Sequence, residues 1–91
     1  MADTRDVVFK ALADASRRRL IDLLHRENGL ALRDLCEHLD MTRQGVSQHL
    51  AVLEGANLVT TLWHGREKLH YVNVAPLREI YRQWLGKFQL T

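Results

Sequence analysis

The sequence predicts a mostly α-helical fold, with about five helices and a small β-hairpin, in one domain that spans residues 1–91. Apolar residues recur at helical spacing over most of the chain, and two short runs of strand-favouring residues flank a polar segment in its second half. No repeat, low-complexity tract or linker interrupts the chain. A chain of this length has room for only one hydrophobic core.

Local capping signals delimit the first two helices. A first helix is expected over residues 4–12, where apolar residues lie on one face. Asp14 or Ser16 can cap a second helix, which is expected to reach about residue 26. The pair Asn28-Gly29 then ends that helix.

The fourth predicted helix carries the clearest functional signal. It follows a third helix over residues 32–39 and a tight turn, Thr42 can cap it, and it should end near residue 56. Its apolar residues fall on one side, and the opposite side carries small and polar residues, with no acid between residues 40 and 54. The residues of this polar side are Gln44, Ser47, Gln48 and Ala51, with Arg43 at the start of the helix. Amides can bond base edges and hydroxyls can reach phosphates, so this face suits a DNA major groove.

A β-hairpin is expected directly after this helix. Residues 58–63 and 69–74 favour strands, and the polar segment between them forms a basic tip with Arg66 and Lys68. A helix-turn-helix followed by such a hairpin is the order of a winged helix-turn-helix. In that fold, Arg66 and Lys68 can lie along the phosphate backbone or enter the minor groove.

A last helix begins at Pro76 and carries a wide apolar stripe. One subunit can cover part of it, but two large aromatic side chains near the end of a small domain favour packing against a second copy of the chain. The residues of the stripe are Leu77, Ile80, Tyr81, Trp84, Leu85 and Phe88.

Composition and charge restrict the function further. The formal net charge is +2, but residues 41–91 hold three acids against six bases, which indicates a polyanionic partner. The single cysteine allows no intrachain disulfide, and we expect a cytoplasmic protein with neither an export signal nor a membrane span. Enzyme activity is not expected and no cofactor is implied, because Cys36 and His38 diverge on their helix and nothing completes a catalytic site.

One alternative stays open. A winged helix can serve protein–protein contacts without binding DNA, which would also account for the exposed apolar residues. An acidic or apolar face on the fourth helix would favour that alternative, and the observed face is neither.

The chain resembles the ArsR/SmtB family of bacterial winged-helix repressors. The segments that carry the resemblance are FKALAD (residues 9–14), DLC (34–36), VSQHLAVLE (46–54) and LHY (69–71). MTRQGVSQHL (41–50) and APLREIY (75–81) are most similar to the branch that lacks metal ligands. The chain departs from the family at Asn57, where the family has glycine, although asparagine also tolerates this backbone conformation. It also has Gly45 inside the recognition helix. Because glycine disfavours a helix, we expect the first turn of that helix to order fully only on DNA.

The resemblance implies a homodimer that binds a pseudo-palindromic double-stranded operator. Its first and last helices, about residues 4–13 and 76–89, would form the dimer interface, which adds Val8 to the stripe described above. By position, the residues that would touch DNA are Thr42, Arg43, Gln44, Ser47 and Gln48, with Arg66 and Lys68 on the wing. His49 lies beside them and is interpreted as a packed or hydrogen-bonding residue rather than a base reader.

No metal site is expected. The family's thiolate pair falls on Ala31 and Arg33, which cannot ligate, and the last helix has no His or Asp for the family's other site. A site formed by His64 and His70 of the wing is the remaining alternative. The sequence does not indicate a small-molecule effector, the operator or the regulated genes.

Overall fold

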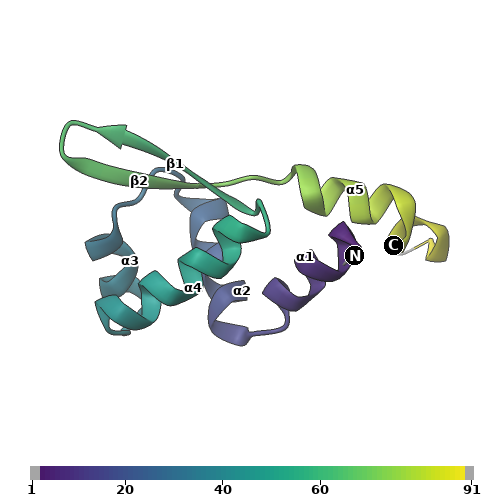
Figure 1. Ribbon diagram of the computed structural model, residues 1–91, viewed down its shortest axis with the longest axis horizontal. Coiled ribbons are helices and arrows are strands. Elements are labelled where there is room, and N and C mark those ends of the chain that lie inside the picture. The colour runs from purple at the N-terminus through teal and green to yellow at the C-terminus, as the bar shows by residue number, and fades with distance from the viewer. Residues whose placement is uncertain (1–2, 90–91) are drawn as a thin grey trace.

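The structure is a computed structural model that describes residues 3–89. It contains five α-helices and a two-stranded antiparallel hairpin, as predicted (Figure 1). In chain order the elements are α1 (Thr4–Leu12), α2 (Ala15–Arg26), α3 (Leu32–Leu39), α4 (Arg43–Gly55), β1 (Val59–His64), β2 (Glu67–Val72), α5 (Ala75–Gln83) and a 3₁₀ turn (Leu85–Phe88).

The elements form an elongated body, 42 Å along its longest axis, with different surfaces at its two ends. Figure 1 shows α4 in front of α2, and the hairpin extending along one side beyond the end of the helical body. At the opposite end, α1 packs against α5, so the first and last helices lie side by side. The hairpin and the α1–α5 pair are therefore free to serve separate partners.

The core lies where α2, α3 and α4 meet the start of the hairpin. Its largest fully buried side chains include Leu20 and Leu24 of α2, Leu35 of α3, Leu53 of α4 and Leu58 before β1. The three residues expected on the inner side of α4, which are Val46, Leu50 and Leu53, are at most 3% exposed. Burial of this side fixes the rotation of α4 and turns its polar side outward.

The predicted caps are present. The Asp14 carboxylate accepts hydrogen bonds from the backbone N–H groups of Ser16 and Arg17, so Asp14 rather than Ser16 begins α2. The Thr42 hydroxyl accepts one from the N–H of Gly45 at the start of α4. Asn57 has a φ of 60°, the left-handed conformation expected after that helix.

The tip of the hairpin is shorter than expected. His64 pairs with Glu67, so only Gly65 and Arg66 form the turn, and Lys68 lies within β2 opposite Trp63. The polar residues 65–68, which were expected to form the tip, therefore do so only in part, because Glu67 and Lys68 belong to β2. Gly65 has a φ of +64°, and a glycine in this conformation at the first central position permits a two-residue type II′ turn.

The base of the hairpin is joined to the loop between α2 and α3. Leu30 and His70 exchange backbone hydrogen bonds, and the Nδ1–H of the buried His70 donates to the carbonyl of Leu30 at 2.9 Å. Asn28 Oδ1 accepts a further bond from the N–H of Val72. His70, within β2, therefore anchors this strand to the helical body.

The last helix is interrupted. It ends at Gln83, Trp84 departs from helical geometry with φ −137° and ψ −59°, and the 3₁₀ turn follows. The expected continuous helix over 76–89 was therefore wrong. Gly86 permits this tight turn, because a Cβ at this position would lie 2.8 Å from the carbonyl oxygen of Tyr81.

Candidate nucleic-acid interface

The outer face of α4 presents hydrogen-bonding side chains with no carboxylate among them. Arg43, Gln44, Ser47 and Gln48 are all exposed, and the neighbouring Ala51 leaves room for a close approach. Within residues 3–89, the amides of Gln44 and Gln48 have no intrachain hydrogen-bond partner. Both amides are therefore free to bond another molecule.

Thr42 and Gly45 shape the N-terminal end of this face. Thr42 is exposed, and because its oxygen accepts the capping bond, its hydroxyl hydrogen is still available to a phosphate. A Cβ at Gly45 would lie 3.1 Å from that oxygen, so the glycine leaves space for the cap. The structure thus gives Gly45, which is unfavourable for helix propensity, a role in keeping Thr42 in place.

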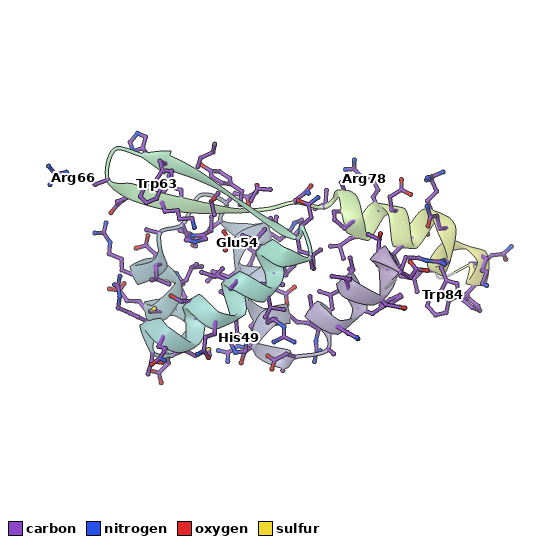
Figure 2. All side chains as sticks on the ribbon, in the orientation of Figure 1. His49, Glu54, Trp63, Arg66, Arg78 and Trp84 are labelled. Carbon is purple, nitrogen blue, oxygen red and sulfur yellow. The ribbon has the colours of Figure 1, made fainter. Side chains whose placement is uncertain are left out.

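The two basic residues of the wing differ in their surroundings. Arg66 is exposed at the end of the wing, as Figure 2 shows, and no carboxylate of the described residues lies within 4.0 Å of it. Lys68 Nζ instead lies 3.6 Å from Glu54 Oε1 of α4. Surface pairs of this kind contribute about 0–1 kcal/mol, so a phosphate can replace Glu54 as the partner of Lys68.

A groove of about 430 Å³ separates α4 from the wing. Arg43 and Ser47 line it from α4, and Trp63, Arg66 and Lys68 line it from the hairpin. Trp63 was not among the residues predicted from the sequence to contact DNA. Strand alternation contains the signal, since Trp63 lies opposite Lys68 in the register and paired residues share one face.

Arg17 connects three helices behind the interface. Its guanidinium donates to the carbonyls of Ala11 and Lys10 at the end of α1, at 2.6 and 3.1 Å. Its Nη1 lies 3.4 Å from Nδ1 of His49 on α4, and because a guanidinium only donates, this nitrogen of His49 is the acceptor. The contact supports the interpretation of His49 as a hydrogen-bonding residue.

Arg18 and Arg19, which follow Arg17 in α2, are exposed. The guanidinium of Arg18 also donates a hydrogen bond to a carbonyl of α1, that of Leu12 at 2.6 Å. The carboxylate of Asp14 lies at the same junction. Hydrogen bonds from the backbone N–H groups of Arg17 and Ser16 hold the pKa of Asp14 below its usual value.

The residues predicted for the dimer interface fall into two groups. Val8 and Ile80 are 1% and 3% exposed within one subunit, so their side chains belong to its core and have no surface left for a partner. Leu77 and Leu85 are half-buried against the same core. Three residues remain accessible, which are Tyr81, Trp84 and Phe88.

An exposed aromatic cluster surrounds Trp84. Its ring meets Phe9 of α1 at a centroid distance of 5.8 Å and Phe88 at 5.4 Å, both edge to face. Phe9 is 39% exposed and was missed by the sequence analysis, although it lies in the predicted first helix. Figure 2 places Trp84 at the end of the molecule opposite Arg66.

The potential metal ligands are dispersed. His64 pairs with Glu67 and His70 with Thr61, so the two wing histidines lie three positions apart and point to opposite faces of the hairpin. Within residues 3–89, no group of three His, Cys, Asp or Glu side chains is arranged to hold an ion. In the same part of the chain, no helix has the length and apolar character to cross a membrane.

Comparisons with known proteins agree with this geometry. A family model described as a helix-turn-helix domain matches residues 12–61. The uncharacterized HTH-type transcriptional regulator YuzN of Bacillus subtilis is 36% identical, over 93% of this chain and 99% of its own. The chain is also similar to the solved structure of an ArsR-like transcriptional regulator from Rhodococcus sp. RHA1, with a TM-score of 0.84 and 28% identity over 94% of this chain and 79% of that one.

The chain belongs to the ArsR/SmtB family. It is a DNA-binding transcriptional regulator with a winged helix-turn-helix fold. The chain is also similar to the transcriptional repressor SdpR of Bacillus subtilis, which is 29% identical over 89% of this chain and 88% of its own. The family assignment makes α4 the recognition helix and the β1–β2 hairpin the wing. These relatives are named as regulators rather than enzymes.

Proposed function

We propose that this protein is a cytoplasmic, homodimeric repressor that binds a pseudo-palindromic operator. The observation that carries the proposal is the outer face of α4, where exposed amides and hydroxyls stand without a carboxylate and Arg43 lies at the helix start. A major groove offers base edges to the amides and phosphates to the hydroxyls and the arginine. The similarity to SdpR, a named repressor, supports repression rather than activation.

The contacts divide into base readers and backbone anchors. Gln44 and Gln48 have free amides and read base edges, whereas Thr42 and Ser47 bond phosphates. Arg66 at the wing tip anchors the flanking backbone. Lys68 joins it when the pair with Glu54 opens.

The dimer is formed by α1 and α5 with the turn after it. Trp84 and Phe88 remain 38% and 55% exposed in one subunit, and Phe9 of α1 adds to the same surface. Large aromatic side chains gathered at one surface favour burial against a partner. A two-fold axis at this end would place two recognition helices on successive turns of one face of the duplex.

Selection of bound sequences from random duplexes tests the proposal. The expected result is an enriched motif with two symmetric half-sites, separated by about one helical turn or a multiple of it. Light scattering on the same preparation should give twice the monomer mass. If folded protein enriches no duplex, the proposal is wrong and the protein-contact alternative is favoured.

We also propose that regulation by this protein does not depend on a metal ion. Ala31 at the start of α3 cannot ligate, and Arg33 pairs with Glu67 of the wing at 2.8 Å. The two wing histidines point to opposite faces of the hairpin. These residues offer no constellation of three or four ligands.

A further inference from the structure

Trp63 is exposed without an evident structural role. It is 70% exposed, the highest value among the large apolar side chains of residues 3–89. An indole in water contributes little to the core, so the exposed position of Trp63 indicates a contact with another molecule rather than a role in folding.

The register of the hairpin shows where this indole lies. Trp63 shares a face with Val59 and, across the ladder, with His70, and both of these residues are buried against the helical body. Trp63 therefore continues the inner face of the wing beyond the edge of the core. There it borders the groove opposite Arg43 of α4.

The charges in the groove define what can fill it. Of its cationic side chains, Arg33 is paired with Glu67 and Lys68 with Glu54. Arg43 and Arg66, also in the described part of the chain, have no carboxylate within 4.0 Å. The occupant should therefore be an anion that also offers an apolar surface to the indole.

The backbone of duplex DNA meets both requirements, and the geometry of the duplex brings it to this place. A strand of deoxyribose and phosphate separates each major groove from the adjacent minor groove. When α4 enters the major groove and the wing reaches toward the minor groove, that strand must pass between them. The groove beside Trp63 lies between the same two elements.

We propose that Trp63 is a DNA-contacting residue whose indole packs on the deoxyribose of this strand. The ring covers the carbon face of the sugar, and its Nε1–H can donate to a neighbouring phosphate oxygen. Arg43 and Arg66 bind phosphates on either side. This inference rests on the proposed function, because it requires α4 and the wing to bind one duplex together.

The neighbouring residue supplies a matched control. Leu62 is 64% exposed, but it lies on the opposite face of the wing, opposite Leu69, and does not line the groove. Truncation of either exposed side chain should leave the thermal unfolding midpoint nearly unchanged. The pair therefore separates a contact in the groove from a general effect on the wing.

The test compares Trp63→Ala, Leu62→Ala and the unchanged protein on a duplex selected by the unchanged protein. Fluorescence anisotropy over a range of salt concentrations gives the affinity and its salt dependence. Trp63→Ala should weaken binding about tenfold, equivalent to 1.4 kcal/mol, and Leu62→Ala less than twofold. Because an indole carries no charge, Trp63→Ala should keep the salt slope, whereas Arg66→Ala should flatten it.

Hydroxyl-radical footprinting gives a direct readout, because these radicals attack deoxyribose. Trp63→Ala should lose protection at a few sugars in each half-site and keep the rest of the pattern. The inference is overturned if Trp63→Ala binds and protects like the unchanged protein, or if both variants lose affinity equally. If the unchanged protein selects no duplex, the proposed function fails and this inference fails with it.

Discussion

Replacement of Arg17 by alanine tests whether the junction of α1, α2 and α4 stabilises the protein. The side chain is 17% exposed and donates to two carbonyls at the end of α1. In the variant, water can replace the guanidinium as the hydrogen-bond partner of the carbonyls, so each bond contributes a net stabilisation of only about 1 kcal/mol. Loss of both bonds should therefore lower the free energy of unfolding by about 2 kcal/mol. For a domain of this size that loss lowers the melting temperature by about 8–16 °C.

The chain offers a matched control for this change. Arg19 lies two residues further along α2, is exposed, and makes no described hydrogen bond or ion pair within residues 3–89. Arg19→Ala should therefore change stability by less than about 0.5 kcal/mol. Arg17→Lys should fall between the two, because an ammonium group has no planar fork for two carbonyls.

Urea unfolding followed by circular dichroism measures all three variants. Protein concentration must be equal throughout, because dimerisation makes the apparent stability depend on it. If Arg17→Ala is no less stable than Arg19→Ala, the bonds to α1 contribute nothing net and the reasoning is refuted.

Further predictions concern DNA, assembly, metals and acid. Gln48→Ala should cost about 1–3 kcal/mol at particular base pairs, whereas Arg66→Ala should weaken all sequences alike; equal losses on every duplex for both would contradict the division into readers and anchors. Trp84→Asp should place a charge in the dimer surface and cost several kcal/mol of association, and an unchanged mass in light scattering would refute the proposed interface. Zinc, cobalt and arsenite should leave operator affinity unchanged, and a stoichiometric shift of tenfold or more, about 1.4 kcal/mol of coupling, would show metal sensing. Because the pKa of Asp14 is lowered in the folded state, its ionised carboxylate stabilises the fold above about pH 4, and this stabilisation is lost as the pH falls through the folded-state pKa. Asp14→Asn keeps the cap without an ionisable group, so this variant should lose less stability in acid; an equal loss in acid would contradict the prediction.

The features that the sequence predicted well depend on local chemistry. Asp14 and Thr42 cap the helices that they precede, and Asn57 adopts the left-handed turn. Each of these choices involves a side chain and a backbone group only a few residues away. The inner side of α4 could also be predicted from the sequence, because helical spacing defines a face without reference to the rest of the fold.

The features that it missed depend on how neighbouring elements pack together and on the exact length of one turn, neither of which residue spacing defines. An apolar stripe on the last helix indicates burial, but spacing does not show what covers it, and Ile80 proved to pack inside its own subunit. The role of Arg17 required the end of α1 to lie beside the start of α2. Lys68 was placed at the wing tip because the polar run 65–68 was longer than the turn that Gly65 permits.

The wing is held firmly at one end and weakly at the other. At its base, hydrogen bonds from His70 and Val72 join β2 to residues 28–30. Near its tip, the ion pairs that link it to the body within residues 3–89 are the partly exposed pairs Arg33–Glu67 and Lys68–Glu54, which are screened by salt. The tip of the hairpin can therefore move relative to α4, to match the width of a minor groove, while its base stays attached to the helical body. Adaptation to operators of different shape then requires a change in two solvent-exposed contacts and leaves the packing of the core undisturbed.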